Sequence, residues 1–232
     1  MSEKSQKPIP ASPTESGAPA AQPLRILIVD DHAIVRDGLR QLLASKLPQA
    51  IFGEGRNAQE ALERVIKEPW NVLLLDISMP GQSGLDVLQQ IKVLQPSLKV
   101  LVLTRHPEDQ YALRVLKAGA AGYLTKETAS AEVVNAVQAV QKGGKYISAS
   151  LAQRLVSNLN APAQKAPHEG LSDREFQVLR MIAAGKSVKE IAFDLSLSVK
   201  TVSTYRTRVL AKLGFKTNAQ AIRYAMREKL VE

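Results

Sequence analysis

Short apolar runs alternate with longer segments of helical periodicity through the first two thirds of the chain. Runs of strand length occupy residues 24–29, 50–53, 72–76, 99–103 and 121–124. Between and after them, the spacing of apolar residues predicts helices over about residues 33–47, 57–66, 84–94, 108–118 and 130–141. Strands that alternate with helices in this way predict a doubly wound α/β fold, in which helices cover both faces of a five-stranded parallel sheet.

Polar residues end four of these predicted strands. Asp30 and Asp31 follow the first strand, Asp76 ends the third, Thr104 follows the fourth, and Lys126 follows the fifth. Right-handed crossovers bring all these ends to one edge of the sheet, where open α/β sheets bind ligands. Three carboxylates repel one another unless a cation joins them, and oxygen ligands with open positions suit Mg²⁺.

A lysine and a threonine hydroxyl at the same edge are the groups that bind phosphoryl oxygens. The residues therefore predict a Mg²⁺-assisted phosphoryl site with Asp76 as its nucleophile or as a metal ligand. The alternative is a purely structural cluster of ion pairs at the edge of the sheet.

Over residues 24–142 the chain resembles the receiver domain of bacterial two-component response regulators, which has a flavodoxin-like fold. The matching motifs are Leu27-Ile28-Val29-Asp30-Asp31-His32, Leu75-Asp76-Ile77-Ser78-Met79-Pro80-Gly81, Val102-Leu103-Thr104 and Gly122-Tyr123-Leu124-Thr125-Lys126. The resemblance implies that Asp76 accepts a phosphoryl group from a sensor histidine kinase.

The same resemblance implies further roles at this edge. Asp31, Asp76 and the backbone carbonyl of Ser78 would bind Mg²⁺ directly, and Asp30 would act through water. Thr104 and Lys126 would contact the phosphoryl oxygens, and Tyr123 would be the aromatic side chain that rotates on activation. Arg105 departs from the pattern, because a smaller residue often follows the threonine, and it bears on the lifetime of phosphorylated Asp76.

The C-terminal residues 168–232 predict a small all-α domain of four helices. Capping boxes at Ser172…Glu175, Ser187…Glu190 and Thr217…Gln220 begin three helices, and Ser198 caps another. Helices over 187–195 and 198–213, joined by a short turn, have the spacing of a helix-turn-helix. This region carries twelve basic and seven acidic side chains within a chain of net charge +9, which favours binding of a polyanion.

The C-terminal region resembles the LuxR-type helix-turn-helix. The matching motifs are Leu171-Ser172-Asp173-Arg174-Glu175, Ser187-Val188-Lys189-Glu190-Ile191-Ala192 and Ser198-Val199-Lys200-Thr201-Val202-Ser203-Thr204. The resemblance implies that a helix in the major groove reads double-stranded promoter DNA. Ser203, Thr204 and Thr207 would face bases, and Lys200, Thr201, Tyr205 and Arg208 would face the backbone. Tyr205 stands where the family usually has histidine, and the alternative for this domain is a protein-docking module.

The remaining segments are predicted to be a tail and a linker, and the whole chain is predicted to be soluble. Residues 1–23 are rich in Pro, Ser, Ala and Gly and predict disorder, and residues 143–167 predict a linker that holds a helical piece over about 149–159. The chain contains no cysteine, which excludes disulfides and thiolate metal sites. It has no membrane-length apolar run and no signal peptide at its N-terminus, so we expect a cytoplasmic protein that does not bind membranes.

A receiver followed by a LuxR-type helix-turn-helix is the architecture of the NarL/FixJ response regulators. We therefore expect a phosphorylation-activated transcription regulator, not an enzyme, that forms a homodimer when phosphorylated. Before phosphorylation, the receiver would cover the recognition helix or hold the domains apart. One alternative is a regulator that binds DNA without phosphorylation. The other is an aspartyl-phosphate-forming hydrolase, against which the loops offer no evident general base.

Overall fold

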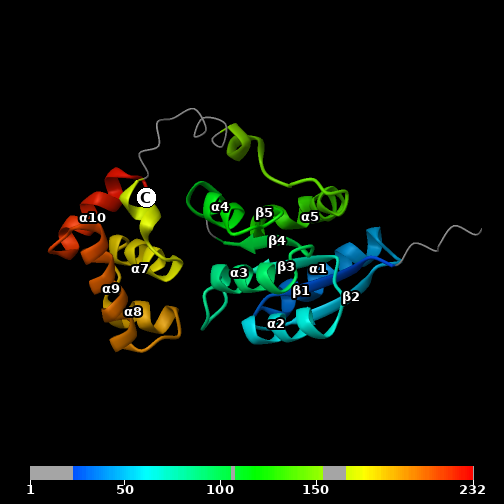
Figure 1. The fold of residues 1–232 in the computed structure, drawn as a ribbon, viewed down its shortest axis with the longest axis horizontal. Coiled ribbons are helices and arrows are strands. Elements are labelled where there is room, and N and C mark those ends of the chain that lie inside the picture. Colours follow the sequence, from blue (N-terminus) through cyan, green and yellow to red (C-terminus); the bar gives the residue numbers. More distant parts are fainter. Residues whose placement is uncertain (1–22, 106–107, 154–165, 232) are drawn as a thin grey trace, which may run out of the picture.

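The computed structural model describes residues 23–105, 108–153 and 166–231, which form two units in Figure 1. The predicted tail falls outside the described residues except for Pro23, and residues 154–165 of the predicted linker also fall outside them. Of the helical piece predicted over about 149–159, residues 149–153 are helical and the rest lies outside the description. Within the described ranges, none of the helices has the length and apolar character needed to cross a bilayer.

The first unit has the alternating order that the sequence predicts. Its elements are β1 (Arg25–Val29), α1 (Ala33–Lys46), β2 (Ile51–Gly55), α2 (Ala58–Lys67), β3 (Val72–Asp76), α3 (Gly84–Leu94), β4 (Lys99–Thr104), α4 (Glu108–Lys117), β5 (Gly122–Thr125) and α5 (Lys126–Gln141). The start of α5 corrects the sequence prediction, which began this helix near residue 130. Thr125 caps α5 by accepting a hydrogen bond from the amide of Thr128, so Lys126 is the first helical residue.

All five strands are parallel, in the order β2-β1-β3-β4-β5, which is the flavodoxin-like order. Alternate residues of each strand face opposite sides. On one side Ile26 and Ile28 pack with α1 and α5, and on the other Leu27 and Val29 pack with α2 and α3. Both faces of β1 and β3 are therefore covered, which explains why nearly every residue of these strands is apolar.

The second unit consists of short helices that begin where the capping residues predict. Its elements are η1 (Pro167–Gly170), α7 (Asp173–Ala183), α8 (Val188–Asp194), α9 (Val199–Leu213) and α10 (Asn218–Arg227). Complete capping boxes stand at Ser172, Ser187 and Thr217. Ser196, with φ of 52°, makes the turn between α8 and α9, so the helix-turn-helix spacing is confirmed.

The segment after α5 stays with the first unit before the chain leaves it. Tyr146 donates its amide hydrogen to the Ala121 carbonyl (2.9 Å), and its own carbonyl accepts from the Tyr123 amide (3.1 Å). Further on, Leu151 is 4% exposed within the same apolar core that contains α4. Residues 145–151 thus cover the outer edge at β5, which would otherwise present unpaired backbone groups.

Candidate functional site

The predicted acidic edge is assembled by the ends of three central strands and the first residue of α5. Asp30 follows β1, Asp76 ends β3 and Thr104 ends β4, and all three are fully buried. Lys126 extends into this edge, where its Nζ lies 2.6 Å from Asp76 Oδ2 and 2.6 Å from Asp30 Oδ2. One ammonium group therefore joins two buried carboxylates from neighbouring strands.

The loop from β3 to α3 fixes the second oxygen of Asp76. The Ser78 amide donates to Asp76 Oδ1 at 2.7 Å, and the Ser78 hydroxyl lies 3.2 Å from the hydroxyl of Thr104. Gly84 permits this loop path, because a Cβ at that position would stand 2.2 Å from the Cα of Ile77. Asp76 is thus held through one oxygen by the loop and through the other by Lys126.

Burial has the largest effect on the pKa values of Asp76 and Lys126. It raises the pKa of the Asp76 carboxyl group, and the neighbouring charge of Asp30 raises this pKa further. Lys126 and the Ser78 amide act in the opposite direction without cancelling it. Burial also disfavours the charged form of Lys126, but the hydrogen bonds to Asp30 and Asp76 outweigh it and raise the pKa of the ammonium group. Ionised Asp76 would therefore be stabilised by further positive charge.

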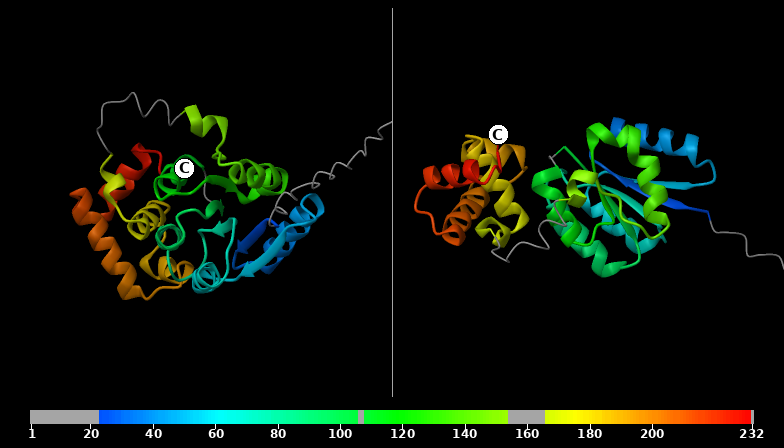
Figure 2. Two further views of the ribbon diagram at one scale, coloured as in Figure 1. Left: turned by 45° about the vertical axis from the view of Figure 1, so that its right-hand side comes forward. Right: turned by 90° about the horizontal axis from the view of Figure 1, so that it is seen from above.

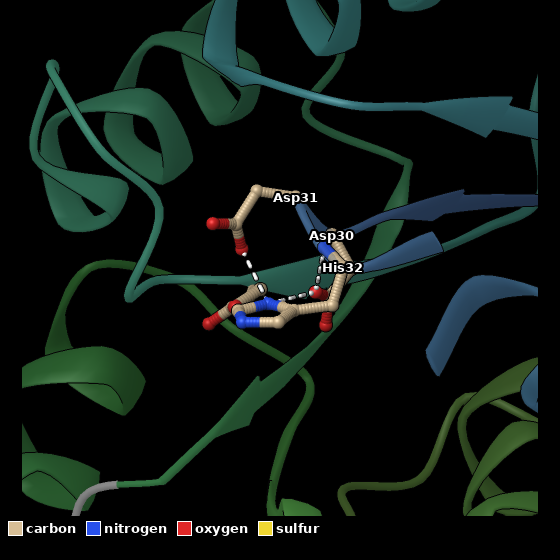
Figure 3. A group of neighbouring side chains, drawn as sticks. Asp30, Asp31 and His32 are labelled. Atoms are coloured by element: carbon tan, nitrogen blue, oxygen red, sulfur yellow. Dashed lines mark hydrogen bonds and ion pairs between the residues drawn. The ribbon is translucent and has the colours of Figure 1, made fainter. Parts of the chain in front are cut away.

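His32 joins the acidic cluster from the loop after β1, which Figure 3 shows. Its Nδ1 lies 2.8 Å from Asp31 Oδ1 and 3.2 Å from Asp30 Oδ1. Its Nε2 lies 3.3 Å from Nη2 of Arg105, from the loop after β4. The sequence prediction gave this imidazole no role, although its position directly after Asp30 and Asp31 indicates that it lies close to the acidic edge.

The donor set of this cluster fits a hard divalent cation. Ligand atoms of Asp30, Asp31, His32 and Asp76 all lie within 4.8 Å of one another, and burial raises the pKa of Asp76, so that an added cation would favour its ionised form. Carboxylate oxygens are what Mg²⁺ prefers. Ser78 is placed beside Asp76 by its amide, whereas a metal contact of its carbonyl stays a prediction. Tyr123 is 3% exposed on β5, next to the site strand β4.

The residues predicted to read DNA lie together on α9. Val202 and Val209 are fully buried and anchor the helix to the domain core. Of the predicted contact residues, Lys200, Thr204, Thr207 and Arg208 are exposed, and Thr201, Ser203 and Tyr205 are half-buried. The Thr204 hydroxyl donates to the Lys200 carbonyl and that of Thr207 to the Ser203 carbonyl, each at 3.0 Å. These bonds orient both hydroxyl oxygens while leaving them able to accept hydrogen bonds.

The two units meet through α4 and the segment η1–α7. The ring of Tyr111 on α4 packs edge-on against Phe176 on α7, with centroids 5.5 Å apart. The guanidinium of Arg114 lies 4.2 Å from the centroid of Phe176 and donates to the carbonyls of His168 (2.5 Å) and Leu171 (3.0 Å). It also pairs with Asp173 at 3.3 Å.

Within the described residues, this contact leaves Lys200, Thr204, Thr207 and Arg208 of α9 exposed. Arg174 on α7 also donates a hydrogen bond to the Gly81 carbonyl, in the loop that carries Ser78. In Figures 1 and 2, α7 faces the first unit and α9 lies on the far side of the second. The sequence left open whether the receiver covers the recognition helix or holds the domains apart. In the structure the receiver docks on α7 and does not cover α9.

Comparisons with known families match both units. The model of the response regulator receiver domain matches residues 26–138, and the model of bacterial regulatory proteins of the luxR family matches residues 169–225. The first match contains the acidic edge, and the second contains α9.

Relatives match the chain over almost its whole length. The response regulator GacA of Pseudomonas protegens is 37% identical over 90% of this chain and 98% of its own, and UvrY of Escherichia coli K12 is 36% identical over 89% and 95%. A solved structure of the response regulator RcsB of Salmonella typhimurium is similar with a TM-score of 0.61 and 29% identity, over 88% of this chain and 98% of that one. RcsB has also been solved bound to DNA, in a structure with a TM-score of 0.55, 30% identity and the same coverage.

Proposed function

We propose that this chain, which belongs to the NarL/FixJ family of two-component response regulators, is switched by phosphorylation of Asp76 by a sensor histidine kinase. The observation that carries the assignment is the contact of Asp76 Oδ2 with Lys126 Nζ at 2.6 Å, beside the equally buried carboxylate of Asp30. A carboxylate attacks phosphorus only when ionised, and the cation beside it stabilises the ionised form.

The proposed reaction uses groups whose positions are fixed before the phosphodonor arrives. Oδ1 of Asp76 is held by the Ser78 amide, which leaves the carboxylate in one orientation. Lys126 can move its ammonium group from the carboxylates to the new phosphoryl oxygens, and the Thr104 hydroxyl lies on the same edge. Asp30, Asp31, Asp76 and the Ser78 carbonyl would hold Mg²⁺, which supplies positive charge for the phosphoryl oxygens.

The switch would act through residues that connect this edge with the output surface. Thr104 ends β4, the strand that leads toward α4, and Tyr123 lies on the adjacent β5. Movement of Thr104 and Lys126 toward a phosphoryl group would change the packing around Tyr123 and α4. Since α4 carries Tyr111 and Arg114, such a change would weaken the contact with α7.

The output would be recognition of promoter DNA by a dimer. Lys200, Thr201, Tyr205 and Arg208 would contact the backbone, while Ser203, Thr204 and Thr207 would contact bases in the major groove. One module makes few contacts, so two modules reading paired half-sites are needed for tight binding. This self-contact would use α10, where Ala219 and Met226 are exposed, whereas Ala225 of the same apolar stripe is buried and Ile222 packs against the domain core. Because the proposed target is bacterial promoter DNA, we expect the protein to act in the cytoplasm.

The direct test replaces Asp76 by asparagine, which is nearly isosteric but a poor nucleophile. With Mg²⁺ and a small phosphodonor, the wild-type protein should gain the mass of one acid-labile phosphoryl group, as expected of an aspartyl phosphate, and Asp76→Asn should gain none. A mutant that still gains a phosphoryl group would show that Asp76 is not the acceptor. Continuous release of phosphate without a kinase would instead favour a hydrolase.

A further inference from the structure

The side chain of Arg36 is a buried cation beside the acidic edge that the proposed reaction leaves without a role. It lies on the first turn of α1, and the residue is 8% exposed. Its Nη1 donates to the backbone carbonyl of Asp30 at 2.8 Å, a bond that is itself buried. Its Nε lies 3.3 Å from Oε2 of Glu54, near the end of β2.

This bidentate use of the guanidinium joins the ends of two neighbouring strands to α1. Asp30 also donates its amide hydrogen to the Gly55 carbonyl at 3.2 Å, so both sides of the Asp30 residue are fixed. The peptide group between Asp30 and Asp31 is planar, and the direction of the Asp30 carbonyl therefore sets the direction in which the chain continues into Asp31. The His32 amide, which bonds to Asp30 Oδ1 at 2.9 Å, completes the turn.

We propose that Arg36 is a positioning residue that holds the Asp30–Asp31 turn in the geometry needed to bind a divalent cation. The inference rests on the proposed function, because it assigns the cation site to the same acidic edge. Arg36 itself would not be a ligand of the cation. It acts through the Asp30 carbonyl, as the groups that hydrogen-bond to metal ligands commonly do.

Arg40 provides a matched control on the same helix. It lies one turn further along α1, and its Nε pairs with the other oxygen of Glu54 at 3.2 Å. Its side chain is 47% exposed, compared with 9% for Arg36. Loss of Arg40 removes the same charge and a bond to the same carboxylate, but it leaves the bond from Arg36 to the Asp30 carbonyl intact.

The test measures Mg²⁺ binding to the full-length, unphosphorylated protein by titration calorimetry. Arg36→Met should weaken Mg²⁺ binding by roughly 10- to 100-fold, the usual effect of losing a group that orients a metal ligand. The Mg²⁺ affinity of Arg40→Ala should stay within about 3-fold of the wild-type value, because this variant loses only an exposed ion pair. Arg36→Lys keeps the charge without the two-point geometry and should also bind weakly.

A second measurement separates positioning from general damage to the fold. The rate of phosphorylation by a small phosphodonor should reach its wild-type value in Arg36→Lys when Mg²⁺ is saturating, so that only the half-saturating Mg²⁺ concentration shifts. Wild-type Mg²⁺ affinity in both Arg36 variants would overturn the proposal, and so would a loss that is equal in Arg40→Ala. Failure of the wild-type protein to bind Mg²⁺ would instead contradict the proposed function itself.

Discussion

Replacing Arg114 by alanine should open the contact between the two domains. The change removes two hydrogen bonds to the carbonyls of His168 and Leu171, the ion pair with Asp173 and the stacking over Phe176. Both members of the ion pair are mostly buried, with side chains 16% and 14% exposed. Removing one partner of a buried pair costs about 3 kcal/mol at the lower end of measured values. The docking equilibrium would therefore shift by about 100-fold.

Lys117 offers the control for this change. It lies one turn further along α4 and also reaches across the contact, with Nζ 3.3 Å from Glu169, but its side chain is 59% exposed. An exposed pair contributes less than about 1 kcal/mol, so Lys117→Ala should leave most molecules closed. Small-angle X-ray scattering of the unphosphorylated proteins would measure the radius of gyration, which should rise for Arg114→Ala alone.

The same variants can be compared in DNA binding without a phosphodonor. If docking on α7 restrains the C-terminal domain, Arg114→Ala should bind promoter DNA more tightly than wild type, and Lys117→Ala should not. An unchanged radius of gyration for Arg114→Ala, or an equal rise for Lys117→Ala, would refute the argument from burial.

Three further predictions concern the switch, the pH dependence and the DNA contacts. Lys126→Ala should still permit some phosphorylation but should uncouple it from DNA binding, because the ammonium group no longer pulls on the phosphoryl oxygens; a titration of phosphorylated mutant with DNA checks this. Burial, and after it the charge of Arg114, lowers the pKa of the His168 imidazole in the folded state. The folded state therefore disfavours the protonated imidazole. The free energy of unfolding should fall as the pH drops below the unfolded-state pKa of about 6.5. Urea midpoints should therefore decline less steeply toward acid in His168→Gln than in wild type. Thr207→Ala should alter sequence preference, whereas Lys200→Ala should weaken binding to all sequences and reduce the salt slope by about one.

The sequence predicted those features that depend on local chemistry. Apolar runs and capping residues placed the strands and most helix starts, because Asn57, Ser172 and Ser187 act on amides three residues away. The meeting of Asp30, Asp76 and Lys126 followed from the rule that parallel strands share one carboxyl edge. The start of α5 was missed because the capping role of Thr125 competed with its reading as the end of a strand.

Features that depend on packing between distant segments could not be predicted. The burial of Arg36 depends on how α1 lies across the ends of β1 and β2, and nothing in the local sequence distinguishes it from the exposed Arg40. The docking of α4 on α7 joins residues more than fifty positions apart, and its aromatic and cationic side chains also suit an ordinary solvated surface. These contacts are decided by tertiary structure, so the choice of α7 as the docked helix was open from the sequence.

The decisive test of the proposed switch is the effect of Asp76 phosphorylation on DNA affinity. Double-stranded DNA selected from a random pool against the phosphorylated full-length protein would provide the operator. Affinity for this operator should rise at least about 5-fold on treatment with a phosphodonor and Mg²⁺, the lower end of usual coupling between sites, and Asp76→Asn should show no rise. Equal affinity before and after phosphorylation of Asp76 would contradict a phosphorylation-driven switch.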